Sequence, residues 1–223
     1  PPENDMHAYA TTEFISSTTN PSTTMTSITI PTKILAAAVS MAAKKDVRYY
    51  LNTVLIELAK DGTTFVVSSD GPALFAARLP HQHTEQPRTL MIPRDVAEAA
   101  AKTRADYVTL HIADTGTDHS LTTGAVEHKF TQEDGRFPDW RRVIPSGDPT
   151  GAGAHLDARL SYAAAMAVDL AEGHPKKMQG RCGRWDWRGP DNAAVYVGAS
   201  GENIAVVMPI RSRALHKATP FKF

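Results

Sequence analysis

The chain twice places a short apolar strand directly before a proline that opens a helix. In the first copy residues 27–30 alternate polar and apolar side chains and Pro31 follows; in the second, residues 90–92 are apolar and Pro93 follows. Proline suits the first turn of a helix, where its missing N–H breaks no hydrogen bond. Strand-like runs follow each helix, so the chain reads as a repeated α+β unit. Each unit has an apolar helix face and an apolar sheet face that a neighbour must cover.

The expected elements keep the same order in each copy. The first copy has a helix over residues 34–43, then strands over 47–58, 63–69 and 73–79, with a hairpin signal at Asp61-Gly62. The second has a helix over residues 95–103, then strands over 107–112, 120–123 and 126–131. A third strand–helix–three-strand copy is expected after a Gly- and Pro-containing linker at 146–151. His155 and Leu156 lead into its helix at 157–171, with strands over 179–187, 193–198 and 204–208.

Composition narrows the function classes. Lysine plus arginine equals aspartate plus glutamate at 24 each, which argues against a simple polycationic DNA binder. Cys182 is the single cysteine, so no intrachain disulfide forms and a reducing, cytoplasmic location is expected. No apolar run approaches the ~20 residues that span a bilayer, and no signal-peptide pattern is present, so no membrane association is expected.

Three segments resemble the bacterial DNA polymerase III beta sliding clamp family. Residues 46–52 (Asp-Val-Arg-Tyr-Tyr-Leu-Asn) and the Ser-Asp-Gly turn at 69–71 are similar to its middle domain. Residues 134–145 contain Arg-Phe-Pro-Asp-Trp-Arg-Arg-Val, where the family carries Arg-Phe-Pro-Asp-Tyr-Arg-Arg-Val. Residues 206–211 end in Met-Pro-Ile-Arg, close to the family's Met-Pro-Met-Arg ending. The three occur in the family's order within the repeated α+β pattern, which makes their combination specific.

The resemblance implies an α+β, DNA-clamp-like fold of repeated β-α-β-β-β units, with antiparallel sheets outside and helices on the inner face. It implies a homo-oligomeric, non-enzymatic processivity factor or scaffold without cofactor or catalytic residue. Its expected partners are double-stranded DNA, held without sequence preference, and DNA polymerase or other replication and repair proteins with short clamp-binding peptides. The chain divides into a flexible leader (1–26), a clamp-like domain of two units (27–145), a shortened last domain of one unit (146–211) and a tail (212–223).

The family's peptide-binding cleft lies between the middle and last domains. By resemblance, the matching positions are Leu51, Ser69, Gly71, Leu74, Pro138, Arg142, Val143, Val206, Met208, Pro209, Ile210 and Arg211. Aliphatic side chains, a methionine and prolines suit a dry groove for an extended peptide with Leu or Phe anchors. The alternative is that these are ordinary strand-core residues. Pro72-Ala73 stands where the family usually has His-Arg, which removes a long cation from the rim.

Basic residues on or beside the helices are the candidates for facing DNA phosphates. They are Lys33, Lys44, Lys45, Arg94, Lys102, Arg104 and Arg159. A sliding protein needs modest basic density rather than tight base contacts. The alternative is a solvated helix face.

The chain also departs from the family pattern. The family's first domain is absent, and its last domain normally holds two units where this chain has room for about one. A sheet edge is then expected to lack its partner, so a second hypothesis is a truncated homologue that binds clamp partners without encircling DNA.

Other residues suggest weaker alternatives. The histidines, including His81, His83, His111 and His119, raise a metal- or His-dependent enzyme, but no zinc-ligand spacing accompanies them or Cys182. Trp185 and Trp187 share one strand face and suit either base stacking or the covering of a sheet end. The Phe pair in Pro220-Phe221-Lys222-Phe223 suits docking in a neighbour's cleft or a disordered tail.

Overall fold

The structure is a computed structural model that describes residues 25–80, 87–113, 118–150, 153–174 and 183–210. The first unit holds β1 (Met25–Pro31), α1 (Thr32–Met41), β2 (Thr53–Leu58), β3 (Thr64–Ser69) and β4 (Ala73–Leu79). The second holds β5 (Arg88–Pro93), α2 (Arg94–Ala101), β6 (Tyr107–Ala113), β7 (His119–Thr123) and β8 (Val126–Phe130). The last part holds α3 (Ala158–Glu172), β9 (Arg184–Asp186), β10 (Ala194–Val197) and β11 (Asn203–Val207).

The first two units exchange their leading strands. β1 does not join the sheet of its own unit but pairs antiparallel with β6, from Met25↔Ala113 to Pro31↔Tyr107. In the same way β5 pairs antiparallel with β2, from Thr53↔Pro93 to Leu58↔Arg88. The result is a four-stranded sheet in the order β1-β6-β7-β8 and a second sheet that begins β5-β2-β3-β4. Because each sheet takes a strand from both units, neither unit is a closed module.

The third unit extends the second sheet. β11 pairs antiparallel with β4, so that sheet reaches seven strands in the order β5-β2-β3-β4-β11-β10-β9. The expected leading strand of a third full copy is wrong within the described residues, because residues 153–157 enter α3 without forming a strand. In the first two units, the strand that follows the helix pairs with the leading strand of the other unit: β2 pairs with β5, and β6 pairs with β1. The corresponding strand of the third unit is β9, which lies at the outer end of the seven-stranded sheet.

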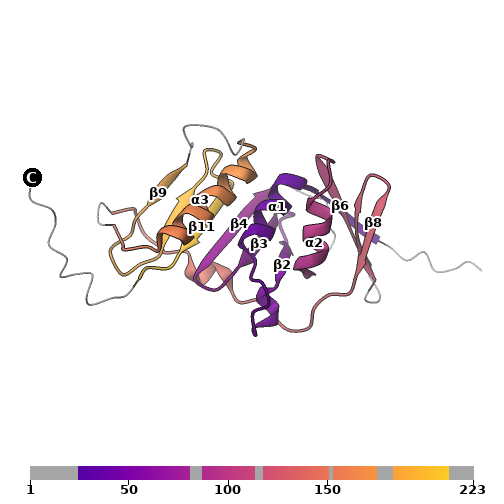
Figure 1. The fold of residues 1–223 in the computed structure, drawn as a ribbon, viewed down its shortest axis with the longest axis horizontal. Helices are drawn as coiled ribbons and strands as arrows, with labels where there is room; N and C mark the ends of the chain where they lie inside the picture. Colours follow the sequence, from indigo (N-terminus) through magenta and orange to yellow (C-terminus); the bar gives the residue numbers. More distant parts are fainter. Residues whose placement is uncertain (1–24, 81–86, 114–117, 151–152, 175–182, 211–223) are drawn as a thin grey trace, which may run out of the picture.

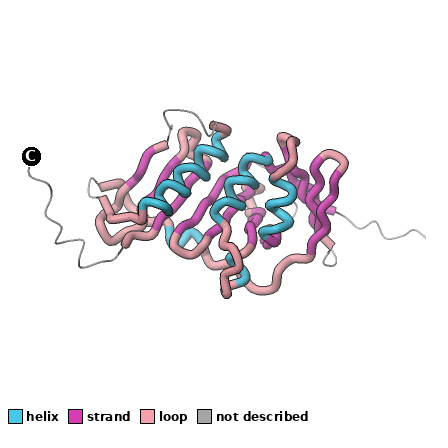
Figure 2. Tube along the Cα trace, viewed as in Figure 1, coloured by secondary structure: helices cyan, strands magenta, loops and turns pink. Residues whose placement is uncertain are grey.

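The helices form one layer on one face of the sheets (Figures 1 and 2). α1 lies between α2 and α3, and alanines on α1 and α3 let these two helices approach closely. Alternate residues of each strand point into this layer. Phe75 on β4 and its cross-strand partner Ala205 on β11 are fully buried there, in the main apolar core. The expected arrangement of antiparallel sheets with helices on one side is confirmed.

The opposite face of the seven-stranded sheet has a second, smaller core. It contains the alternate strand residues, such as Leu74 and Val206, and the ring of Trp140. Trp140 belongs to the linking segment, residues 131–143, which follows β8 and ends in the 3₁₀ turn η2 (Trp140–Val143). The linking segment therefore crosses the sheet on the side away from the helices.

One expected strand is wrong at its start. Residues 47–52 are not extended: they form a loop with the 3₁₀ turn η1 (Tyr49–Leu51), and β2 begins at Thr53. The loop is closed by Asn52, whose side chain accepts from the backbone N–H of Asp46 at 2.9 Å and donates to its carbonyl at 2.9 Å. Such local bonds compete with the ladder of a strand.

Several expectations concern residues outside the described ranges. These are the leader up to residue 24, His81, His83, Cys182, Arg211 and the tail. Of the other expected elements, the helices and strands lie within a few residues of their expected bounds. Within the part of the chain that the structure describes, no helix is long and apolar enough to cross a membrane.

Candidate functional site

An apolar cleft lies on the sheet face away from the helices. Its empty volume is about 590 Å³, which includes space open to solvent, and its lining is mainly apolar. Four parts of the chain line it: the η1 loop, the β3–β4 turn, the linking segment and the end of β11. The lining residues are Arg48, Tyr50, Leu51, Ser69, Gly71, Pro72, Ala73, Leu74, Phe137, Pro138, Asp139, Trp140, Val143, Val206 and Met208.

The floor of the cleft is a cross-strand pair between the first and third units. Leu74 on β4 lies directly opposite Val206 on β11, and both are almost fully buried. Directly opposed residues of an antiparallel pair point to the same face of the sheet. Met208 follows β11, and its backbone N–H donates to the carbonyl of Pro72 at 2.9 Å. The floor therefore depends on the joint between the two units.

Trp140 forms the wall. Its side chain is 6% exposed, and its ring packs against Phe65 with the two centroids 5.4 Å apart. Its indole N–H donates to Glu57 Oε2 at 2.9 Å, and Arg141 Nη1 donates to the same oxygen at 2.9 Å. The Arg141 guanidinium also lies 4.2 Å from the Trp140 ring centroid, a cation–π geometry. These contacts fix the linking segment over the sheet.

Glu57 is ionised at the back of this wall. Burial opposes its charge and is the largest single influence, but the hydrogen bonds from Arg141 and Trp140 together outweigh it. The pKa of Glu57 is therefore below its ordinary value. A charged acceptor strengthens both bonds that position Trp140.

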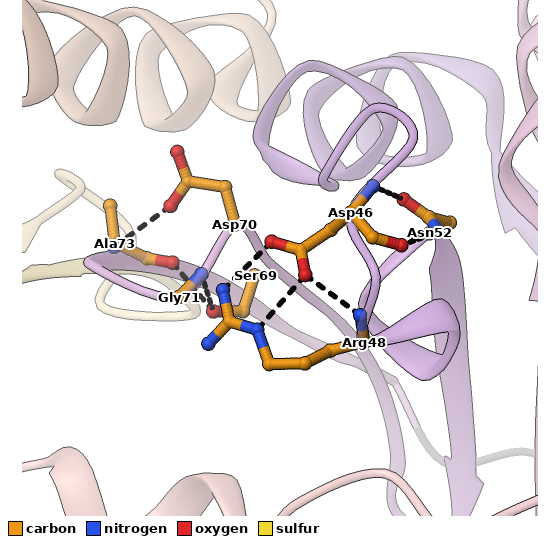
Figure 3. A network of polar contacts seen from close by, with 7 residues as sticks. All are labelled: Asp46, Arg48, Asn52, Ser69, Asp70, Gly71 and Ala73. Atoms are coloured by element: carbon orange, nitrogen blue, oxygen red, sulfur yellow. Dashed lines mark hydrogen bonds and ion pairs between the residues drawn. The ribbon is translucent and has the colours of Figure 1, made fainter.

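Arg48 stands on the rim, held by Asp46 (Figure 3). Arg48 donates from Nε at 3.0 Å and from Nη2 at 2.8 Å to the two carboxylate oxygens, and its backbone N–H donates to Oδ1 at 2.8 Å. The hydrogen bond from the Arg48 side chain is the main cause that lowers the pKa of Asp46 to about 2. The contact is thus complete above the ordinary pKa of 3.8 and is lost as the pH falls through about 2.

The β3–β4 turn meets Arg48 from the other side. Gly71 has φ +104°, and a Cβ there would lie 2.8 Å from Arg48 Nη2. Its N–H donates to Ser69 Oγ at 3.0 Å, and that hydroxyl donates to the carbonyl of Ala73 at 2.7 Å. Burial raises the pKa of Asp70, which also accepts from the N–H of Ala73 at 2.9 Å. Glycine is needed at this turn for its backbone conformation and for the space that Arg48 fills.

The structure brings together eight of the twelve expected cleft residues: Leu51, Ser69, Gly71, Leu74, Pro138, Val143, Val206 and Met208. Arg142, Pro209 and Ile210 do not line the cleft, although Arg142 and Pro209 adjoin lining residues. Arg211 lies outside the described residues. Residues missed by the sequence reasoning include Arg48, Tyr50, Phe137 and Trp140. All four lie inside the motifs that carried the resemblance, so a signal for them was present.

Three of the seven expected DNA-facing cations have an ion-pair partner. Arg94 and Lys102 both pair with Glu98, at 2.7 and 3.0 Å, at spacings of four residues along α2. Arg159 pairs with Asp157 at 3.3 Å, at the start of α3. Such exposed pairs contribute little to stability but neutralise the local charge.

The remaining cations differ in position. Lys33 lies at the C-terminal end of α3, since a Cβ on Gly173 would be 3.0 Å from its Nζ, and a cation there complements the helix dipole. Lys44, Lys45 and Arg104 are exposed and form no ion pair with the described residues. The helix layer therefore carries less uncompensated positive charge than its sequence indicates.

The alternative sites find little support. No group of three or more His, Cys, Asp or Glu side chains that could hold a metal occurs in the described ranges. His119 is buried against Phe130, and its ring nitrogen lies 3.3 Å from the N–H of Ala113. Trp185 stacks on Trp187 with centroids 5.8 Å apart and packs against Tyr196. The tryptophan pair thus covers the outer end of the seven-stranded sheet.

Comparison with known proteins finds similar sequences among bacterial beta sliding clamps. No protein-family model matches the chain. The beta sliding clamp of Pseudomonas putida is 35% identical over 109 residues, which cover 47% of this chain and 29% of that protein. The beta sliding clamp of Vibrio cholerae is 38% identical over 110 residues, covering 46% of this chain and 28% of that protein. The matched stretch thus spans less than a third of these relatives.

Solved structures show the same fold. A DNA polymerase sliding clamp from Pseudomonas aeruginosa superposes with a TM-score of 0.63 at 19% identity, over 84% of this chain and 67% of that one. The DNA polymerase III beta subunit of Thermotoga maritima gives a TM-score of 0.61 at 16% identity, over 84% and 66%. This chain is therefore a homologue of the bacterial beta sliding clamp, matched over 47% of its own sequence.

Proposed function

We propose that this chain is a clamp-type scaffold that captures short apolar peptide segments of DNA polymerase or other replication and repair proteins. The observation that carries the proposal is the cleft over the Leu74–Val206 pair, whose lining is mainly apolar. Burying one Leu or Phe side chain contributes about 1.5–3 kcal/mol, so two anchors give a weak but specific contact after the peptide is ordered. Met208 adds a side chain that adapts to different anchors.

Shortening the cleft residues tests peptide capture. Met208→Ala and Leu51→Ala are each expected to weaken binding of a fluorescent, acetylated hexapeptide with Leu and Phe anchors by about three- to tenfold, because each removes apolar contact area. Met208 is 40% exposed, so its replacement should leave the fold stable. Leu51 is 3% exposed, so the folded state of that variant is checked by circular dichroism.

Val126→Ala is the matched control for this titration. Val126 is 51% exposed on β8, in the other sheet, and does not line the cleft. Fluorescence anisotropy should give this variant the affinity of the parent. If all three variants and the parent bound the hexapeptide with equal affinity, the cleft would not be the peptide-binding site.

Double-stranded DNA is the second proposed partner, held loosely by the helix layer. Lys44 and Lys45 are the cations that carry this part, because they are exposed at the end of α1 and unpaired within the described residues. Weak phosphate contact suits a protein that slides. The several ion pairs on α2 and α3 keep the attraction small.

Reversing these two charges tests the DNA contact. Lys44→Glu with Lys45→Glu is expected to weaken association with a duplex at low salt and to reduce the slope of log K against log salt by up to about 2. Lys129→Glu on β8, an exposed residue of a strand and not of the helix layer, serves as control. If the double variant and the parent give superimposable salt titrations, these lysines do not face DNA.

A second candidate function is a homologue that binds clamp partners without encircling DNA. The position of β9 favours it, because within the described residues no leading strand pairs with β9 as β5 pairs with β2 and β1 with β6. Light scattering combined with retention on circular and linear DNA separates the two functions. A closed homo-oligomeric ring stays on the circle and leaves the linear form; a monomer retained on neither supports the second function.

A further inference from the structure

The cleft presents apolar surface to solvent at the point where the described chain leaves it. Val143 and Met208 line the cleft at 36% and 40% exposure, and Ile210, two residues on, is 40% exposed. Backbone bonds hold this exit in place: Met208 donates to Pro72, and Ile210 donates to the carbonyl of His155 at 2.7 Å. Whatever follows Ile210 therefore starts beside the cleft.

The sequence that follows has the chemistry of a cleft ligand. Residues 211–223 contain Arg211, Arg213, Lys217 and Lys222 and no acidic residue, and they include Pro220-Phe221-Lys222-Phe223. Proline disfavours a helical conformation of the residue before it, so this stretch suits an extended ligand. In an extended chain the two phenylalanines point to one side and Lys222 to the other.

We infer that Phe221 and Phe223 occupy the cleft of their own chain and thereby compete with partner peptides, an inference that rests on the proposed function of the cleft. Extended chain spans about 3.3 Å per residue, so the residues between Ile210 and Phe221 can reach over 30 Å, enough to turn back onto a cleft that starts at Met208. Both rings then lie over Leu74 and Val206.

Local charge is compatible with the same placement. The linking segment that borders the cleft carries the exposed acids Glu133, Asp134 and Asp139 as well as the exposed Arg136 and Arg142, and Asp139 lines the cleft itself. The charged side chains of residues 211–223 are all basic, so Asp139 attracts them. With both rings turned into the cleft, Lys222 points outwards, where the rim carboxylates are within reach of its flexible stem.

Occupation within one chain is favoured over docking in a second copy. A tether of this length gives an effective concentration on the order of 1 mM, far above a protein concentration in the micromolar range. If the tail itself has a Kd of about 0.1 mM for the cleft, this effective concentration weakens the binding of a peptide in trans about tenfold.

The test uses the full chain and a fluorescent peptide of residues 213–223. Phe221→Ala with Phe223→Ala is expected to bind this peptide about tenfold more tightly than the parent, because the tail no longer competes. Leu215→Ala, which alters the tail outside the Phe pair, should behave as the parent. Adding Met208→Ala to the double variant should weaken its binding of this peptide again.

Three results would overturn the inference. One is equal affinity of parent and double variant for the tail peptide. Another is no binding of the tail peptide to the double variant while the Leu/Phe hexapeptide still binds, which leaves the proposed function intact. The third is a difference in peptide affinity between parent and double variant that disappears when the protein is diluted. Such a result would mean that the cleft binds the tail of a second copy. Failure of both peptides on the double variant overturns the proposed function as well.

Discussion

Replacing Trp140 with alanine is expected to lower the free energy of unfolding by about 3–5 kcal/mol and to abolish measurable peptide capture. The ring is 6% exposed and packs on Phe65, so its removal leaves a cavity in the core on the cleft side of the sheet. It also takes away one of the two side-chain donors of Glu57, a partly buried carboxylate. The loss of a charged group's partner adds to the cost of the cavity.

Two variants separate these contributions in urea denaturation. Trp140→Phe keeps a ring but no N–H, so its loss should be smaller, about 1–3 kcal/mol. Trp187→Ala removes the same side chain from the outer end of the sheet, where it stacks on Trp185. That control should lose less stability and should bind the hexapeptide like the parent. If Trp140→Ala retained both stability and binding, Trp140 would not be the wall of the cleft.

Replacing Gly71 with alanine is expected to lower the free energy of unfolding by about 1–3 kcal/mol and to weaken hexapeptide binding several-fold. Its φ of +104° is unfavourable for any residue with a Cβ. The new methyl group would also meet the Arg48 guanidinium, which Asp46 holds in a bidentate contact. Arg48 must then move from the rim, so the effect reaches the cleft and not only the turn.

Gly124→Ala is the matched control for backbone strain. Gly124 has φ +58° in the β7–β8 turn, and a Cβ there meets nothing within 4 Å. It should cost part of the stability that Gly71→Ala costs and leave peptide binding unchanged. Equal loss of binding in the two variants, measured by anisotropy, would show that Arg48 has no part in the cleft.

Local patterns reveal the elements of this fold but not their partners. Pro31 and Pro93 mark two helix starts correctly, alternation locates β1, and the apolar run at residues 90–92 locates β5. The exchange of these two strands between units leaves no trace in the sequence, because an alternating apolar strand fits either sheet equally well. The expected leading strand of the third unit is not found among the described residues. Residues 153–157 precede a helix as the other leading strands do, but have neither the alternation of β1 nor the apolar run of β5.

The aliphatic side chains of the site were predicted, but Arg48 and the aromatic side chains of Tyr50, Phe137 and Trp140 were missed. Leu51, Leu74 and Val206 follow from the resemblance. Arg48 was missed because residues 47–52 read as a strand, and the side-chain bonds of Asp46 and Asn52 that bend this segment are visible only in three dimensions.

The charge of the helix layer was overestimated for a reason that the sequence does contain. Arg94, Glu98 and Lys102 follow each other at spacings of four residues, which brings their side chains together on a helix. Counting the cations of the helix layer without the carboxylates that pair with them makes this layer look more basic than it is.

The central claim is that the Leu74–Val206 floor receives the apolar anchors of a peptide. Intermolecular NOEs between the hexapeptide's Phe ring and the methyl groups of Leu74 and Val206 test it directly, measured with the Phe221→Ala, Phe223→Ala chain so that the tail does not compete. We expect NOEs from both residues, which lie opposite each other on β4 and β11. NOEs confined to another surface, with none to these two side chains, would contradict the account.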